Sequence, residues 1–424
     1  MKLVKQYLVK DSSEDFKELD ALTFHTKNIY NATLYRWRQA LIKDKKILSQ
    51  HENYELLKEQ NCYREIPQNV AASTFNLVQQ NIKAHFCALE SYEKDPSKFT
   101  GKPHLPKYKD PKKGRTVATF TTRVLPKKKA KIDGFIRFTG LNFKLKSDIP
   151  VDDICQVRFV PRDRSIVVEV VYEKNCEPKI ENDNRAAIDL GVNNLAAITS
   201  NIAKPLIING RPLKSINQFF NKRKAALQSS LEKRAKKKAP DGAKKKWSKK
   251  LSRLQSKRNR KIKDYMHKAS KKVCNFCLEN KISILAIGKN DGWKQNANMN
   301  DANNQNFVQI PFEQFISMVK YKCELKGITV KTTNEAYTSV CSFLDEEAAK
   351  FHKTYKGKRV KRGLFKTAKG IKLNADINGS FSILKKAFPS ICANELWDRG
   401  LVVSPKIFTP DREYIRKDKI HNFI

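Results

Sequence analysis

An apolar segment interrupted once by an acid is the feature that most constrains the fold. It runs Ala186-Ala-Ile-Asp-Leu-Gly-Val-Asn-Asn-Leu-Ala-Ala-Ile-Thr199, with Asp189 inside the first apolar run and Gly191 between the two runs. Two apolar runs joined by a short turn that contains glycine predict a β-hairpin. This hairpin presents one carboxylate, that of Asp189.

A second segment, residues 373–384, places another acid at the start of a helix. It reads Leu373-Asn-Ala-Asp-Ile-Asn-Gly-Ser-Phe-Ser-Ile-Leu384. Ile377, Phe381 and Leu384 have the i, i+4, i+7 spacing of a helical apolar face. The pattern predicts a helix that Asp376 opens.

The segments around these two define an order of elements. After the hairpin come a strand over 282–287, a polar loop to residue 307, a helix over 311–326, a strand over 328–333, an insertion over 336–372 and the Asp376 helix. Hairpin, strand, helix, strand and helix is the order of an RNase H-like fold, an α/β domain. Long basic helices are inserted between its third and fourth strands.

The N-terminal part combines strand and helix patterns. Residues 1–10 alternate like a strand, 14–94 have helical periodicity, 95–114 are rich in Pro, Gly and Lys, and short β-type runs fill 115–175. We expect strand 1–10 to join these runs in a β-barrel with the helices inserted. The start has no apolar stretch long enough for a signal peptide or membrane span. We therefore expect a cytoplasmic, nucleoid-associated protein with no membrane partner.

The charge balance predicts a polyanionic partner. The chain of 424 residues contains 85 Lys and Arg against 43 Asp and Glu, a formal net charge of +42. Its hydrophobic fraction of 40% excludes a disordered basic tail. Architectural proteins are equally basic, so charge indicates nucleic acid but not catalysis. The nine cysteines lack the dense spacing of a secreted disulfide scaffold, and we expect reduced thiols.

One basic segment, residues 222–272, has 22 Lys or Arg and three acids. Its sparse apolar residues keep helical spacing, and Pro240-Asp-Gly242 divides it into a helical hairpin. The alternative to nucleic-acid contact is a solvated charged face, but mixed signs would avoid the self-repulsion. We therefore favour contact with a nucleic-acid backbone, here and at two loop lysines. The candidate residues are Lys244, Lys245, Lys246, Lys249, Lys250, Arg253, Lys257, Arg258, Arg260, Lys261, Lys289 and Lys107.

The two aspartates suit metal-dependent phosphodiester hydrolysis. That reaction needs an activated water and neutralised charge on the phosphate, and a pair of Mg²⁺ ions about 3.5 to 4 Å apart supplies both. Hard cations such as Mg²⁺, or Mn²⁺ as a substitute, bind carboxylate oxygens. In an RNase H-like fold Asp189 lies on the central strand and Asp376 on a helix beside it, so the two can share a metal. Actin-type ATPases also begin with such a hairpin, but no adenosine-binding glycine-rich signature follows here.

Both segments resemble the first and third RuvC motifs of the TnpB family, transposon-encoded relatives of type V CRISPR effectors. The resemblance extends through nearly the whole chain and is specific after residue 183. It implies an α+β multidomain protein: a wedge β-barrel from 1–10 and 105–180, a helical recognition lobe over 11–104, and a RuvC-like nuclease domain over 183–424. Within the last it implies a basic helical hairpin at 215–275 and a target-strand-loading-type insertion at 336–372. The implied partners are a guide RNA and target double-stranded DNA.

This chain departs from the family's pattern at the position of the third carboxylate. The family's second motif places a glutamate at the end of the fourth strand, where this chain has Gly288. Glu335, just beyond the fifth strand, is the candidate replacement. Neighbouring strands are about 4.8 Å apart, a distance that a Glu side chain and its turn can bridge. Such a rearranged glutamate looks like a known TnpB subgroup; the alternative is a protein whose catalysis has decayed.

The expected zinc site of the family is also missing from the sequence. Relatives carry two CxxC pairs between the positions of Glu335 and Asp376, but here Cys341 stands alone with Leu344 where a partner thiol would lie. Four tetrahedral ligands therefore cannot be assembled, and we expect no zinc. The one CxxC, Cys274 and Cys277, lies in a helix-like run and is interpreted as a pair of core thiols.

The resemblance implies an RNA-guided DNA endonuclease with Asp189, Glu335 and Asp376 as its Mg²⁺ ligands, and a monomer is favoured. Three rivals stay open. A miniature type V CRISPR effector differs only in its neighbouring DNA. A nuclease-dead, guide-directed binding protein would keep the RNA but not the cleavage. A recombinase acting without RNA would use residues 222–272 as a DNA clamp.

Overall fold

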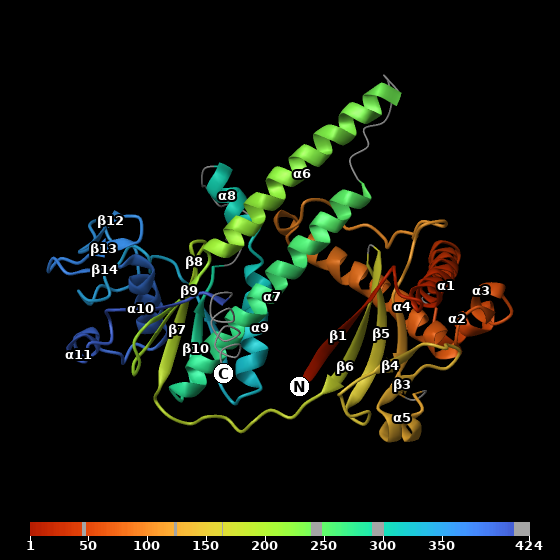
Figure 1. Ribbon diagram of the computed structural model, residues 1–424, viewed down its shortest axis with the longest axis horizontal. Helices are drawn as coiled ribbons and strands as arrows, with labels where there is room; N and C mark the ends of the chain where they lie inside the picture. Colours follow the sequence, from red (N-terminus) through yellow and green to blue (C-terminus); the bar gives the residue numbers. More distant parts are fainter. Residues whose placement is uncertain (45–47, 123–124, 163, 239–247, 291–300, 411–424) are drawn as a thin grey trace, which may run out of the picture. The chain divides into compact units, whose positions relative to one another are not determined.

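The computed structural model describes residues 1–44, 48–122, 125–162, 164–238, 248–290 and 301–410. These residues divide into two compact units, Met1–Asn175 and Cys176–Ile424 (Figure 1). None of the described helices is long and apolar enough to cross a bilayer.

The first unit contains a four-stranded antiparallel sheet. Its order is β1 (Lys2–Lys10), β6 (Ser165–Glu173), β5 (Ile154–Arg162) and β2 (Ala118–Thr121). The N-terminal strand thus pairs as expected, from Lys2 opposite Glu173 to Lys10 opposite Ser165. The expected closed barrel is not shown: in the described residues the edge strands β1 and β2 do not pair, and β3 (Phe135–Arg137) and β4 (Lys144–Lys146) form a separate ribbon.

Four helices of the first unit lie in the range 14–94 that periodicity predicts: α1 (Phe16–Asp44), α2 (Gln50–Leu57), α3 (Asn61–Arg64) and α4 (Gln68–Lys94). The short η1 (Pro96–Lys98) follows them, and α5 (Lys127–Asp133) lies in 115–175, where the sequence predicts β-type runs. Ser49 and Glu52 form a reciprocal capping box that fixes the start of α2. Phe138 packs edge-to-face against two rings of the four-stranded sheet. The distance between ring centroids is 5.1 Å to Phe120 and 5.0 Å to Phe159.

A six-stranded mixed sheet forms the centre of the second unit. Its order is β11 (Thr329–Thr333), β10 (Ile284–Gly288), β7 (Arg185–Leu190), β8 (Asn194–Ser200), β9 (Leu206–Asn209) and β15 (Lys406–Phe408). The hairpin predicted around Asp189 is β7 and β8, paired from Ala186 opposite Ser200 to Leu190 opposite Ala196. β10 runs parallel to both β7 and β11. The expected order of hairpin, strand, helix, strand and helix is therefore confirmed.

Helices cover both faces of this sheet. One core contains Ala186, Ile188 and Leu190 together with α7 (Lys249–Glu279) and α9 (Phe312–Glu324). The other contains Ala187 together with α10 (Ala375–Ala387) and α11 (Ala393–Asp398). Successive strand residues point to opposite faces, so Asp189, two residues after Ala187, faces α10. The remaining helices are α6 (Arg211–Lys238) and α8 (Asp301–Val308), and Figure 1 shows α6 running beside α7. α8 corrects the sequence analysis, which expected a polar loop up to residue 307.

The insertion between Glu335 and Asp376 carries a three-stranded antiparallel sheet. Its strands are β12 (Lys358–Lys361), β13 (Leu364–Lys366) and β14 (Lys372–Asn374). Phe343 stacks on Phe381 of α10, with ring centroids 4.8 Å apart. The buried Asn378 side chain donates to the Cys341 carbonyl (2.8 Å) and accepts from the Phe343 amide (3.1 Å). α10 therefore fixes the start of the insertion close to Asp376.

Candidate active site

Asp189 lies against the first turns of α10. A Cβ atom built on Gly379 would lie 2.8 Å from Asp189 Oδ2, closer than side-chain carbons approach oxygen. Only a glycine at this point of α10 leaves room for the carboxylate. The close approach is supported by Ser380, whose hydroxyl lies 2.9 Å from Thr199 Oγ1 and donates to the Ala187 carbonyl.

Asp376 is held at the N-terminus of α10. Asn374 caps the helix by accepting from the amides of Asp376 and Ile377, which orients the first turn. The Asp376 carboxylate accepts a hydrogen bond from Asn194 Nδ2 at 2.6 Å and pairs with Arg359 Nη2 at 3.2 Å. Asn194 begins β8 and Arg359 lies on β12, so hairpin, insertion and helix meet at this side chain.

Glu335 lies two residues beyond the end of β11. Its amide donates to Asn290 Oδ1 at 3.1 Å, and its carbonyl accepts from the amide and hydroxyl of Thr338. Glu335 Oε2 is buried, and no group in the described part of the chain hydrogen-bonds to it. A buried carboxylate oxygen without a donor carries a desolvation cost, which a cation would remove.

The Glu335 carboxylate reaches the neighbouring strand. Gly288 ends β10 and pairs with Thr333 of β11. A Cβ built on Gly288 would lie 3.1 Å from Glu335 Oε2 and 2.4 Å from Ile383 Cδ1. The space where a side chain at position 288 would begin is therefore occupied by Glu335 and Ile383. The Glu335 side chain thus spans from the end of β11 to the end of β10, while its role as the replacement glutamate stays a prediction.

The three carboxylates interact electrostatically. Burial raises the pKa of Asp189 well above its ordinary value, and the charges of Asp376 and Glu335 raise it further, while Arg359 lowers it. Burial also raises the pKa of Glu335. Carboxylates gathered in this way resist ionising together, and a bound cation reverses that preference.

The donor chemistry fits a hard divalent cation, but the ligands are not assembled as a closed cage. Within the described ranges, no group of three His, Cys, Asp or Glu side chains is arranged to hold a metal ion directly. Asp376 is instead engaged by Arg359 and Asn194. Sequence reasoning missed both partners, although Asn194 follows the Asp189 turn directly and Arg359 lies in a visibly basic run.

The basic side chains predicted to contact nucleic acid differ in their exposure and in their contacts with the rest of the protein. Lys244, Lys245 and Lys246 lie outside the described residues. Arg258 is half-buried and donates to Asn217 Oδ1 and the Gln309 carbonyl, so its guanidinium joins helices rather than facing a partner. Lys289 is paired with Glu313 at 2.9 Å. The others are exposed: Lys249, Lys250, Arg253, Lys257, Arg260, Lys261 and Lys107.

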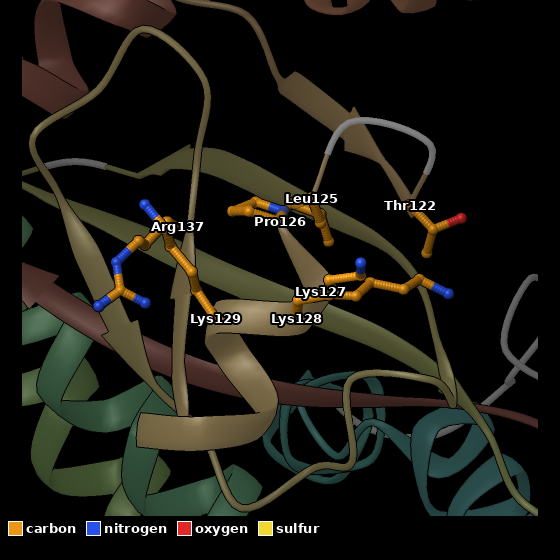
Figure 2. Close-up of a pocket in the computed structure, with 7 residues that line it drawn as sticks. All are labelled: Thr122, Leu125, Pro126, Lys127, Lys128, Lys129 and Arg137. Carbon is orange, nitrogen blue, oxygen red and sulfur yellow. The ribbon is translucent and has the colours of Figure 1, made fainter.

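A second basic surface lies in the first unit. A pocket of about 760 Å³ is lined by Lys127, Lys128, Lys129 and Arg137, with apolar atoms from Leu125 and Pro126. Figure 2 shows these cations around the start of α5. Arg137 is paired with Asp133 and holds the pKa of that carboxyl at about 2. Lys127 lies 3.8 Å from Asp152, so Lys128 and Lys129 provide most of the charge that a polyanion would meet.

Cysteine positions in the second unit agree with the interpretation as reduced thiols. Cys274 and Cys277 lie buried on α7 in one apolar core with Cys323 of α9. Cys341 is buried in the insertion and donates to the Ala348 carbonyl. All nine cysteines are free thiols.

Glu347 links two parts of the insertion. Its Oε2 accepts from the Ser342 amide at 2.8 Å and its Oε1 from the Lys356 amide at 3.0 Å. The side chain is buried, so this carboxylate joins the chain at two points fourteen residues apart. Sequence reasoning missed this role, because nothing in the acidic run Asp345-Glu-Glu347 marks one member as buried.

Two family models match the chain. Residues 165–294 match OrfB_IS605, described as a probable transposase, and residues 312–383 match the Cas12f1-like TNB domain. Residues 165–294 are therefore similar to a probable transposase, and residues 312–383 are similar to a Cas12f1-like TNB domain. The first range contains Asp189 and Gly288, and the second contains Glu335 and Asp376. No curated protein matches the chain.

Solved structures also align with the chain. A Cas12f1 chain from a Cas12f1-sgRNA-target DNA complex aligns with a TM-score of 0.54 and 17% identity over 88% of this chain and 82% of that chain. A Cas_phi3 mini-RNA-guided endonuclease aligns with a TM-score of 0.47 and 11% identity over 91% of this chain and 92% of that chain. The first of these establishes a mixed α+β fold of the Cas12f kind.

Proposed function

We propose that this protein is an RNA-guided DNA endonuclease that cuts target DNA at a single RuvC-like site. The observation that carries the proposal is the Glu335 carboxylate, whose orphaned oxygen lies 3.1 Å from a Cβ position on Gly288. It restores a carboxylate at the place where the RuvC-type glutamate is absent from the sequence. A decayed site would have no reason to keep such a buried acid together with Asp189 and Asp376.

Asp189, Glu335 and Asp376 would hold Mg²⁺. Two such ions activate a water molecule and neutralise charge on the scissile phosphate when they are bound. The chain itself supplies the rest. Gly379 gives Asp189 access to the helix face, Asn374 and Asn194 orient Asp376, and Asn290 positions the Glu335 backbone. Arg359 pairs with Asp376 Oδ1 and would compete with a metal ion for the charge of that carboxylate.

The lysine-rich helices favour recognition of the target sequence by a guide RNA over direct contacts between the protein and the bases. Lysine is a point charge that contacts phosphate, which fixes register but carries no sequence information. The exposed cations of α7 suit the backbone of a guide-target heteroduplex. The aligned Cas12f1 structure is a complex with a single-guide RNA and target DNA, and we propose the same two partner classes here.

Association with a transposon is proposed from the OrfB_IS605 match. A miniature type V CRISPR effector is the second candidate, favoured by the match to the Cas12f1-like TNB domain. The DNA next to the gene distinguishes the two, because an effector would lie beside a CRISPR array and a transposon protein beside transposon ends.

The test is purification from cells that express the protein with its native flanking DNA. RNA that copurifies is sequenced, and a plasmid with a matching target is incubated with the complex and Mg²⁺. We expect cleavage that depends on the match and is lost in Asp189→Asn and Asp376→Asn, while guide and target binding persist. Guided binding without cleavage by the wild-type complex would favour the nuclease-dead protein, and cleavage without any RNA would favour the recombinase.

A further inference from the structure

An exposed aromatic ring lies among free cations where α6 and α7 run side by side. Phe219 is 59% exposed, whereas the adjacent Phe220 is 8% exposed and packs beneath the Arg258 guanidinium. A single exposed ring is common on protein surfaces, so the significance of Phe219 depends on the pocket and the cations beside it. Phe219 is therefore available for contact in a way that Phe220 is not.

A pocket of about 310 Å³ opens beside this ring. Ile216, Phe219 and Phe220 line it from α6, and Leu254, Lys257 and Lys261 line it from α7. The spacings i, i+3, i+4 on α6 and i, i+3, i+7 on α7 place each set on one helix face. An apolar floor is thus bordered by two exposed ammonium groups that make no ion pair or hydrogen bond within the described chain.

The charges around the pocket select an anionic occupant. Arg223 places a third cation 5.8 Å from the centre of the Phe219 ring. The nearest acid on α7, Asp264, is paired with Lys268 at 2.7 Å. An aromatic face with cations at its border is the arrangement that binds an unpaired nucleic-acid base and its flanking phosphates, because every base has a face that can stack.

We propose that the α6–α7 pocket binds an unpaired base of a nucleic-acid strand, with Phe219 stacking on the base and Lys257 and Lys261 contacting the adjacent phosphates. This deepens the proposed nucleic-acid function and rests on it only for the presence of a strand. The test uses binding alone, so the pocket assignment can fail while guided cleavage stands.

The test compares two fluorescent ligands of equal charge. One is a 20-nucleotide oligo(dT), and the other is an abasic strand of the same length that keeps every phosphate but has no bases. Phe219→Ala should weaken oligo(dT) binding about tenfold, which corresponds to about 1.4 kcal/mol. Binding of the abasic strand should change less than twofold. Phe219→Trp should retain the wild-type affinity, and Phe219→Leu should resemble Phe219→Ala.

Salt dependence separates stacking from charge. Phe219→Ala should leave the slope of log affinity against log salt unchanged, because a neutral ring releases no counterion. Lys257→Gln with Lys261→Gln should reduce that slope for both ligands, by about 0.7 for each phosphate that is no longer neutralised. Trp397→Leu, at another exposed aromatic residue of the same unit, serves as the control and should bind normally. Equal losses on the two ligands, or wild-type binding by Phe219→Ala, would overturn the proposal.

Discussion

Glu335 and Gly288 lie on neighbouring strands, and the carboxylate of the first occupies the space beside the second. Glu335 Oε2 lies 3.1 Å from the position that a Cβ on Gly288 would take. A side chain that begins beyond β11 thus ends beside the last residue of β10. This contact is what the proposed replacement of the usual glutamate by Glu335 requires.

Glu335→Gln should abolish cleavage as fully as Asp189→Asn. The amide keeps the shape of the side chain but loses the charge that Mg²⁺ needs, so we expect a reduction well beyond the roughly 100-fold that removal of a supporting group around a metal costs. Target cleavage by guide-loaded protein is the measurement. The control is Glu279→Gln, an exposed glutamate at the end of α7. Full activity in Glu335→Gln would show that the third carboxylate lies elsewhere.

Gly288→Ala should destabilise the second unit through Ile383. The new Cβ would lie 2.4 Å from Ile383 Cδ1, and overpacking of this kind costs about 1–3 kcal/mol. Ile383→Val removes that methyl group and alone costs about 0.5–1.5 kcal/mol. The double variant should be more stable than the sum of the single effects, by urea unfolding. Strict additivity would show that α10 moves away freely. The same contact explains why Gly288→Glu cannot simply restore the usual motif.

Local patterns predicted the elements that carry the site. The β7–β8 hairpin and α10 follow from apolar spacing around Asp189 and Asp376, since both signals lie within about a dozen residues. The closed barrel expected for the first unit was not shown, because alternation indicates that a strand exists but not which edges pair. β15 pairs with β9 across 200 residues, and no local pattern indicates such a partner.

The acids of the candidate site were predicted from the sequence, but the residues that contact them were not. Asp189, Glu335 and Asp376 stood out through motif positions, whereas the Arg359–Asp376 pair depends on how the insertion folds back. Two acids of the insertion have partners that the sequence does not indicate. Glu347 is buried and accepts from two backbone amides, and Glu346 accepts from the Ala393 amide and pairs with Lys385. Burial of one acid in a run of three is set by tertiary packing, which composition does not encode.

Asp189→Asn should raise the thermal stability of the metal-free protein at neutral pH. The pKa of Asp189 is raised in the folded state, so the folded protein binds this proton more tightly than the unfolded chain. Stability from Asp189 is then lost as pH rises from about 4 through the folded pKa. Asparagine carries no charge, so the variant should avoid the loss of stability that ionisation of Asp189 causes at neutral pH. Each 1 kcal/mol of stability corresponds to a change of roughly 2–4 °C in melting temperature. Mg²⁺ should raise the melting temperature of the wild type but not of the variant; Asp398→Asn is the exposed control.

The insertion should be stable without zinc and should depend on Glu347. Elemental analysis is expected to find no stoichiometric zinc, and a zinc chelator should leave the melting temperature unchanged.

Glu347→Ala should leave the amides of Ser342 and Lys356 without their acceptor, at a cost of about 1–3 kcal/mol for each group left buried. Limited proteolysis should then cut within 336–372 faster than in wild type. One zinc per chain would contradict this account and direct attention to Cys341.

Arg258 and Arg260 lie two residues apart on α7 but should behave oppositely. Arg260 is exposed, so Arg260→Gln should leave stability unchanged and reduce the salt slope of duplex DNA binding by about 0.9, the contribution of one phosphate contact. Arg258 is half-buried and donates to Asn217 and Gln309, and burial lowers the pKa of its guanidinium. Arg258→Gln should therefore lower the melting temperature while the slope stays near the wild-type value. A variant that combines Arg260→Gln with glutamine at Lys249, Lys250 and Arg253 extends the test. If its salt slope equals that of the wild type, the cations of α7 form only a solvated face.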